Sequence, residues 1–148
     1  MLTEREVLTK TQVIQISPVT LAFVGDAVYS LFVREKLTLT VGGKTSDLQR
    51  TSATIVSAKG QSVFLDKLLP ILTEEETEVF RRAKNAKKNT KSKSASHLEY
   101  NRSTGLEAVL GYLWLLGEEE RIKTLLSQIE EEDFQTVAVA KPFKPVKR

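Results

Sequence analysis

The chain contains no cysteine and only one histidine, His97. The first absence excludes disulfide bonds, zinc–thiolate centres and thiol nucleophiles. The second excludes a histidine-rich metal site and leaves one candidate base for a Ser-His-Asp triad. No uncharged run is long enough to cross a membrane. The first ten residues, MLTEREVLTK, lack the apolar core of a signal peptide. These absences predict a cytoplasmic protein with no membrane partner.

The length of 148 residues suits one domain with a real hydrophobic core and is too short for two. Hydrophobic residues make up 41% of the chain and charged residues 28%, which is ordinary for a globular protein. We expect one domain over residues 1–133, followed by a basic, proline-containing tail over residues 134–148.

The basic residues are unevenly distributed, although the net charge is only +3. The segment 81–93 has seven basic residues and no acidic one: Arg81, Arg82, Lys84, Lys87, Lys88, Lys91 and Lys93. The last eight residues, KPFKPVKR, add four more. Charge runs are commonly just solvated helix ends and loops, but the length of this one favours contact with phosphates. The distribution therefore indicates a polyanion partner, RNA or DNA.

Apolar residues recur at helical spacing, and no part of the body of the chain alternates convincingly as a strand. The pattern predicts an all-α helical bundle of six or seven helices. Residues 1–16 are a short helix or an arm, and residues 88–97 a polar loop that includes His97. The expected helices cover residues 18–37, 47–58, 59–69, a segment starting at Thr73, 103–117 and 118–132.

Local signals mark several of these boundaries. Ser17 before Pro18 forms an N-cap and first-turn pair. Thr73 and Glu76 have the spacing of a capping box. Gly117 is expected to end its helix in a left-handed conformation. Thr45 or Ser46 would cap the helix that follows Gly43, and Ser103 or Thr104 the helix that carries Glu107.

Asp26 is the only charged residue in the run PVTLAFVGDAVYSLFV, which is apolar nearly all round and therefore expected to be buried in a core or at a subunit interface. A lone carboxylate there is costly unless a hydrogen-bond donor, a cation or a metal meets it. A hydroxyl or a helix N-terminus would be an ordinary partner. Gly25, however, precedes Asp26 in the middle of the expected helix, where glycine lowers helix stability by about 1 kcal/mol relative to alanine. A glycine at such a position indicates that another helix or a ligand approaches closely there.

Glu107 repeats the pattern as the only charge in STGLEAVLGYLWLLG. Alone it could serve only to cap its own helix, since it lies three residues after Thr104. Two isolated acids on two apolar helices instead suggest a shared cation site. Mg²⁺ suits so few ligands, because it keeps several waters and often takes only one or two protein carboxylates. His97 and the aromatic residues Tyr100, Tyr112 and Trp114 are expected to be non-catalytic.

Both acid-bearing segments resemble the ribonuclease III family. LAFVGDAVY resembles the signature helix of that family, and STGLEAVLGYLWL its second catalytic helix. The segments 47–61, 81–87 and 99–108 resemble the short bacterial subfamily, Mini-ribonuclease III. The resemblance covers residues 19–117. It implies that Asp26 and Glu107 are catalytic and hold Mg²⁺, for which Mn²⁺ can substitute.

The same resemblance implies a homodimer that cleaves double-stranded RNA, leaving 5′-phosphates and 3′-hydroxyls. The implied substrate is the 23S ribosomal RNA precursor, with ribosomal proteins as further partners. Since the tail is too short for a double-stranded-RNA-binding domain, the catalytic domain itself would bind the RNA. The candidate RNA-binding residues are Arg81, Arg82, Lys84, Asn85, Lys87, Lys88 and Lys59.

The chain departs from ordinary ribonuclease III at two positions, where the family has further acids and this sequence has Ala22 and Thr104. Mini-ribonuclease III is similar in this respect. If the departures instead marked decay, the chain would be a non-catalytic RNA-binding or ribosome-associated protein on the same fold. A helical protein–protein adaptor with a solvated basic run is the third alternative.

Overall fold

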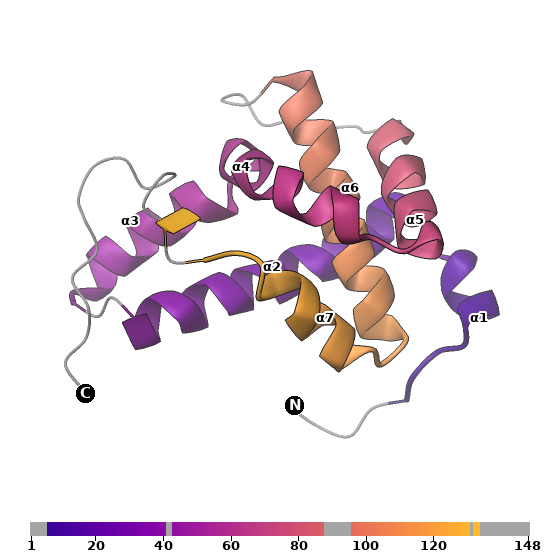
Figure 1. Ribbon diagram of the computed structural model, residues 1–148, viewed down its shortest axis with the longest axis horizontal. Helices are drawn as coiled ribbons and strands as arrows, with labels where there is room; N and C mark the ends of the chain where they lie inside the picture. Colours follow the sequence, from indigo (N-terminus) through magenta and orange to yellow (C-terminus); the bar gives the residue numbers. More distant parts are fainter. Residues whose placement is uncertain (1–5, 41–42, 88–95, 131, 134–148) are drawn as a thin grey trace.

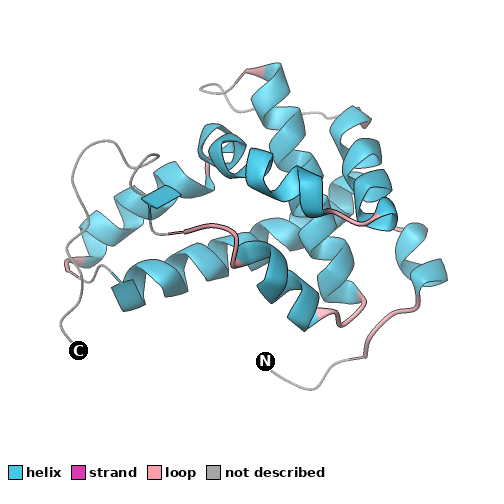
Figure 2. Ribbon diagram, viewed as in Figure 1, coloured by secondary structure: helices cyan, strands magenta, loops and turns pink. Residues whose placement is uncertain are grey.

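The computed structural model describes residues 6–40, 43–87, 96–130 and 132–133. Over these residues the chain forms seven α-helices and one short 3-10 helix, without a strand (Figure 2). The all-α prediction is therefore confirmed. The elements are α1 (Lys10–Ile14), α2 (Pro18–Thr40), α3 (Thr45–Val56), α4 (Ala58–Leu68), η1 (Leu69–Ile71), α5 (Glu74–Asn85), α6 (His97–Leu115) and α7 (Glu119–Leu126). The predicted tail lies outside the described residues.

The two long helices, α2 and α6, cross at the centre of the molecule and share its most extensive contact (Figure 1). Helices α4 and α5 pack on α6, and α3 packs on α2. The end of α5 and the start of α6 lie on the same side of the molecule (Figure 1). This arrangement places the basic end of α5 beside the first turns of the helix that carries Glu107.

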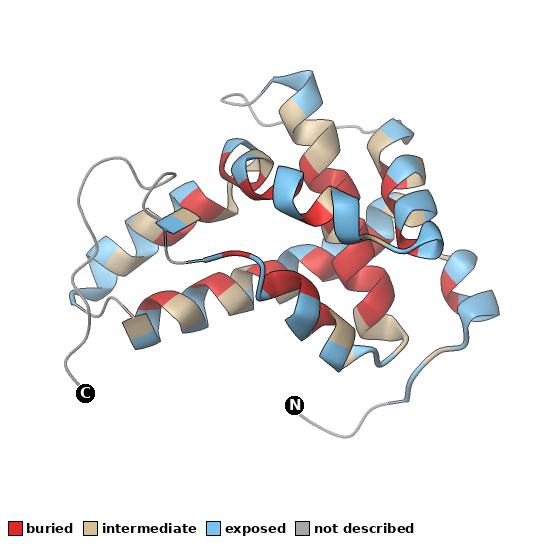
Figure 3. Cartoon of the chain, viewed as in Figure 1, coloured by how far each residue is buried: buried red, intermediate tan, exposed pale blue. Residues whose placement is uncertain are grey.

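The core fills the space between these helices, and its buried segments cluster where α2 and α6 meet (Figure 3). Tyr29 of α2, Phe64 of α4 and Leu110 of α6 are fully buried. Helix α2 is nevertheless not buried on all sides within one chain. Phe23 is 79% exposed and Leu31 is 51% exposed, so one apolar face of α2 is open.

Several predicted boundaries are confirmed by hydrogen bonds. The Thr73 amide donates to Glu76 Oε1 at 2.9 Å and the Glu76 amide donates to Thr73 Oγ1 at 3.1 Å, as a capping box requires. Gly117 has a φ of +77°, and the Glu118 amide then reaches back to the Leu113 carbonyl at 2.9 Å. This 6→1 bond is typical of a helix that ends at a left-handed glycine.

The start of α6 was predicted wrongly. The helix begins at His97, with Ser96 as N-cap and Glu99 completing a capping box. Thr104 lies in the middle of this helix, where its hydroxyl donates to the Tyr100 carbonyl at 3.0 Å. Glu107 is therefore not a capping residue, and His97 lies in a helix and not in a loop.

Smaller corrections concern three other helices. Helix α3 begins two residues earlier than predicted, and its N-cap is Lys44, which makes no side-chain capping bond. Helix α2 continues to Thr40. Helix α7 is shorter than predicted and ends at Leu126, although Ile129 beyond it is still buried. No helix within the described ranges is long and apolar enough to cross a membrane.

Candidate active site

Helices α2 and α6 approach each other so closely that only glycine fits at their crossing. A Cβ atom on Gly25 would lie 1.6 Å from the backbone oxygen of Glu107, and one on Gly111 would lie 1.9 Å from the backbone oxygen of Leu21. The close approach predicted at Gly25 is thus made by another helix. Because Asp26 follows Gly25 directly, this crossing brings the carboxylates of Asp26 and Glu107 together.

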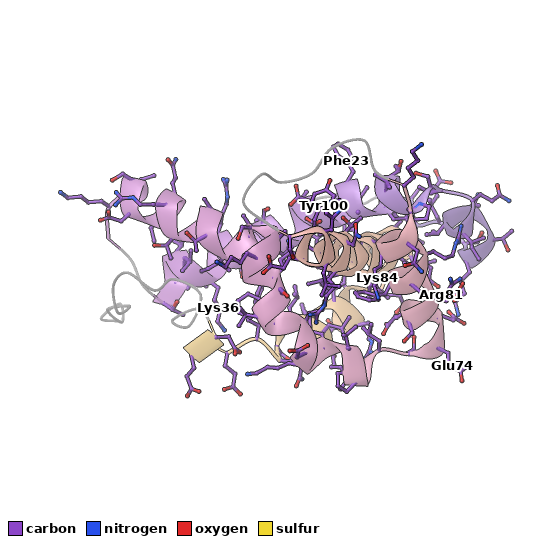
Figure 4. All side chains as sticks on the ribbon, turned by 90° about the horizontal axis from the view of Figure 1, so that it is seen from above. Phe23, Lys36, Glu74, Arg81, Lys84 and Tyr100 are labelled. Atoms are coloured by element: carbon purple, nitrogen blue, oxygen red, sulfur yellow. The ribbon has the colours of Figure 1, made fainter. Side chains whose placement is uncertain are left out.

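A pocket of about 370 Å³ opens at the crossing and contains both acids. Its walls come from α2, from the junction of α3 and α4, and from the first half of α6. Phe23 and Tyr100 line it and lie near one another in the view from above (Figure 4). The two isolated acids of the sequence are therefore neighbours in one cavity that is open to solvent.

The environment of Glu107 raises its pKa to about 9. Burial is the main cause, since it penalises the charged form, and the hydrogen bond and the negative charge of Asp26 add to it. The side-chain amide of Gln61 acts in the opposite sense and favours the ionised form. Without a cation, the surroundings therefore favour the protonated form of the Glu107 carboxyl.

Asp26 itself is exposed within the single chain, so its helix is not buried in the core at this residue. The apolar residues that surround Asp26 along the chain include those of the open face of α2. Glu107 is the half-buried partner, held on a helix whose residues from Ser103 to Leu106 are all buried. The free-energy cost of burying a charged carboxylate therefore applies mainly to Glu107.

Gln61 is a pocket residue that the sequence analysis missed. It is 2% exposed, and its Nε2 donates to the backbone oxygen of Val56 at 3.0 Å. Its Oε1 is buried and has no hydrogen-bond partner. The available signal was its position in α4, where Gln61, Phe64, Leu65 and Leu68 form one inward stripe at helical spacing. A polar residue in such a stripe needs a polar partner in the core.

Ala22 and Thr104, where ordinary ribonuclease III places further acids, also line the pocket. Both are buried, at 6% exposure each. The Thr104 hydroxyl is already committed to the backbone of its own helix. Two of the positions that face the acid pair therefore carry no charge.

The candidate RNA-binding residues lie outside this pocket wherever the structure describes them. Arg81 is exposed and bound to Glu78 of the same helix, through Nε at 3.0 Å and Nη2 at 2.6 Å. Arg82 instead lines a separate, largely apolar groove between α1, α2 and α5. Lys59 and Lys87 are exposed. Lys88 lies outside the described residues.

The aromatic residues divide between the core and the pocket. Tyr112 is buried, with its hydroxyl donating to Glu75 Oε2 at 3.2 Å. Tyr100 is half-buried and lines the pocket, a position that the sequence did not indicate. His97 is exposed at the start of α6 and does not line the pocket.

The oxygen donors of the pocket fit Mg²⁺. Two carboxylates and an unpartnered amide oxygen are the hard ligands that this ion takes, and it retains water in its remaining positions. Among the described residues, no cluster of three or more acidic, histidine or cysteine side chains forms a fuller metal site. Asp26 and Glu107 are accordingly the residues that could hold the ion directly.

Comparison with known proteins identifies the family of the chain. The ribonuclease III domain model matches residues 19–118, and the chain belongs to this family. It is 42% identical to the Mini-ribonuclease 3 of a Thermoanaerobacter species over 82% of this chain and 85% of the relative. It is 46% identical to the Mini-ribonuclease 3 of Symbiobacterium thermophilum over 74% and 84% of the two chains.

A solved structure shares the fold of the chain. The chain resembles a crystal structure of a protein from Fusobacterium nucleatum with a TM-score of 0.69 and 35% identity, over 76% of this chain and 90% of the other. The Mini-ribonuclease 3 relatives and the family model confirm the prediction that the chain is similar to Mini-ribonuclease 3, an endoribonuclease.

Proposed function

We propose that the chain is a Mg²⁺-dependent endoribonuclease that cleaves double-stranded RNA. The observation that carries the proposal is that Asp26 and Glu107 lie together in one open pocket. The two helices that carry them are in backbone contact at Gly25 and Gly111. The family membership supports the reaction class. Products with 5′-phosphates and 3′-hydroxyls are expected.

Asp26 and Glu107 hold the ion in this proposal, and Mn²⁺ substitutes for Mg²⁺. When bound, the ion supplies activation of water and neutralises charge at the phosphodiester. Glu107 must first release the proton that its surroundings favour. Asp26, on the exposed side of the pair, faces solvent, from which both the ion and the RNA arrive.

The basic end of α5 and the segment beyond it are proposed to contact the RNA backbone. The residues concerned are Arg81, Arg82, Lys84, Asn85, Lys87 and Lys88, and Lys59 of α4 is proposed as a further contact. Support comes from the position of the α5 C-terminus beside the first turns of α6, which lead into the acid pocket (Figure 1). Phosphate contacts bind without reading sequence, so the shape of A-form RNA would decide selectivity.

Lys87→Glu tests this surface, with Lys123→Glu on α7 as the matched control. We expect the first variant to weaken duplex binding and to flatten its dependence on salt, because fewer counterions are then released. The control should behave as the parent. Equal binding by both variants and the parent would remove Lys87 from the RNA-binding surface.

The open apolar face of α2 supports a homodimer. Val19, Phe23 and Leu31 are exposed by 41%, 79% and 51% and lie on one side of the helix, four or eight residues apart. A second copy of the chain would remove these side chains from water. Phe23→Asp should therefore give monomers in sedimentation, whereas Val63→Asp, an equally apolar exposed site on α4, should not. A monomeric parent would contradict the dimer.

The finer proposal for the substrate is the base-paired ends of the 23S ribosomal RNA precursor. It is supported by the similarity to Mini-ribonuclease 3 proteins. The test is to incubate that precursor with the protein and to map the new ends. If the protein cleaved other duplexes but not this precursor, the proposed activity would stand and the proposed substrate would be wrong.

Asp26→Asn tests the activity itself. We expect cleavage of double-stranded RNA to disappear while duplex binding persists, since the substitution removes one charge and little volume. Asp47→Asn, at an exposed acid of α3, is the matched control and should cut at the parental rate. If the parent bound duplex RNA but left it intact in millimolar Mg²⁺, the alternative of a non-catalytic RNA-binding protein would replace the proposal.

A further inference from the structure

Gln61 is held in place more firmly than an ordinary side chain in the wall of a pocket. Ser57 caps α4 by accepting from the Gly60 amide at 3.0 Å. The backbone at Gly60 lies against the end of α3, since a Cβ there would be 2.4 Å from the Thr54 oxygen. Gln61 follows directly and donates to the last carbonyl of α3 at Val56. These contacts fix the first turn of α4 against α3 and hold Gln61 in the wall of the pocket.

The orientation of the Gln61 amide is fixed by the same bond. A carbonyl oxygen can only accept, so the group that faces Val56 must be the NH₂ and the other group must be the oxygen. Oε1 is thereby left as a buried acceptor without a donor. Such a group loses its hydration on folding and gains nothing in return, which natural structures seldom tolerate without a water or an ion.

The surroundings of Gln61 offer few protein donors. Among its pocket neighbours, Asp26 and Glu107 are acids that carry negative charge once a cation is bound, and Ala22 and Val56 have no polar side-chain atom. The hydroxyls of Ser103 and Thr104 both donate to the Tyr100 carbonyl, at 2.8 and 3.0 Å. Tyr100, which carries a hydroxyl, also lines the pocket, and the Gln61 side chain hydrogen-bonds to Glu107, which places it directly at the acid pair. A donor that arrives with the cation is therefore a further candidate partner for Oε1.

We propose that Gln61 is a positioning residue of the metal site, whose Oε1 accepts a hydrogen bond from the hydration shell of the ion that Asp26 and Glu107 hold. This inference rests on the proposed function, because it assumes the ion. It adds a third oxygen donor at the acid pair, from a helix that carries neither acid. A neutral amide suits this role, since it orients the shell without adding charge beside two carboxylates.

Two substitutions separate the acceptor from the donor. Gln61→Met keeps the length of the side chain and removes both polar groups, whereas Gln61→Glu keeps an oxygen acceptor and removes the NH₂ donor. Leu65→Val, at a buried position one turn further along α4, controls for loss of packing alone. Binding of Mn²⁺ is measured without RNA, from the signal of the free ion in electron paramagnetic resonance at pH 8. The ion-induced rise in Tm is a second readout.

Gln61→Met is expected to bind Mn²⁺ roughly tenfold more weakly than the parent, as is usual when a partner in the outer shell is removed. Gln61→Glu is expected to bind at least as tightly as the parent, and Leu65→Val to match it. If both Gln61 variants bound like the parent, Gln61 would only join α3 to α4 and the proposal would be wrong. If both bound more weakly, the effect would belong to Nε2, and the acceptor role would be overturned.

The metal site itself is judged separately by Asp26→Asn in the same assay. If the parent and Asp26→Asn bound Mn²⁺ equally, the proposed function would lose its metal site and the role of Gln61 would fail with it. If only Asp26→Asn differed from the parent while Gln61→Met did not, the function would stand and Gln61 alone would be excluded.

Discussion

Gly25→Ala places one methyl group at the point where the backbones of α2 and α6 touch. The added Cβ would lie 1.6 Å from the Glu107 oxygen, 2.5 Å from the Glu107 carbonyl carbon and 2.8 Å from the Gly111 nitrogen. All three atoms are backbone, so no side-chain rotation relieves the clash. Real Cβ contacts stay beyond 3.0 Å, and the helices must therefore separate by about 1.4 Å or more.

The expected loss of stability follows from two opposing effects. Overpacking of this kind destabilises proteins by about 3 kcal/mol at the upper end of its usual range. Alanine offsets about 1 kcal/mol of that, because it favours a helix more than glycine does. A net loss of about 2 kcal/mol lowers Tm by roughly 4–8 °C for a chain of this size. Activity should fall further, by about 100-fold, because a shift of about 1 Å at reacting groups has that effect.

Thermal unfolding and cleavage of a labelled RNA duplex measure both effects. Gly105→Ala is the matched control on α6, because its Cβ would meet only the Phe80 ring at 2.6 Å and the Phe80 oxygen at 3.1 Å. A ring can turn aside, so this variant should lose less stability and keep more activity. A Gly25→Ala protein with the Tm and the cleavage rate of the parent would refute the account of the crossing.

Three further perturbations probe the charges and the caps. The pKa of Glu107, raised from 4.5 to about 9 mainly by burial, means that the folded metal-free protein binds more protons than the unfolded chain between these values. Its stability should therefore fall as pH rises through this window, by at most about 1.4 kcal/mol per pH unit, as measured by unfolding in a chelator. Arg121→Met removes the two N–H groups that reach Glu76 at 2.9 and 2.8 Å. Glu76 is only 3% exposed, so we expect a loss of about 3 kcal/mol in urea unfolding. Thr73→Ala removes the hydroxyl that caps α5 and should lower the unfolding free energy by about 1 kcal/mol.

Each of these expectations has a contrary result. Glu107→Gln should flatten the pH profile, so a slope that survives this change would come from another group. Lys123→Met breaks an exposed pair with Glu120 and should change stability by less than about 1 kcal/mol. An equal loss for Arg121→Met would mean that the buried pair contributes no more than an exposed one. A Thr73→Ala protein as stable as the parent would contradict the capping box.

The sequence predicted the parts of the molecule that depend on local chemistry. The capping box at Thr73, the left-handed Gly117 and the start of α2 at Pro18 depend on residues within a few positions of one another. The pairing of Asp26 with Glu107 could also be predicted, because each acid is conspicuous in its own apolar run. Gly25 added the further clue that a second helix approaches closely.

The errors arose where two local signals competed or where packing decided. Thr104 and Glu107 have capping-box spacing, but so do Ser96 and Glu99, and the helix begins at the earlier pair. Asp26 is exposed because its side of α2 is left uncovered by the rest of the described chain, and the sequence did not decide between a core and a subunit interface for this helix. Gln61 comes to the pocket only because the first turn of α4 packs against α3.

Ala22 and Thr104 have a consequence for how substrate enters the pocket. Every carboxylate beside a reacting phosphodiester repels it, and this repulsion grows in a site that is partly shielded from water. A site with four acids would repel an RNA backbone more strongly than a site with two. Here burial raises the pKa of Glu107 to about 9, so this carboxyl adds little negative charge near neutral pH without a cation. The uncharged side chains of Ala22 and Thr104 thus lower the electrostatic barrier to a polyanion. The same two side chains provide no carboxylate that could bind a cation.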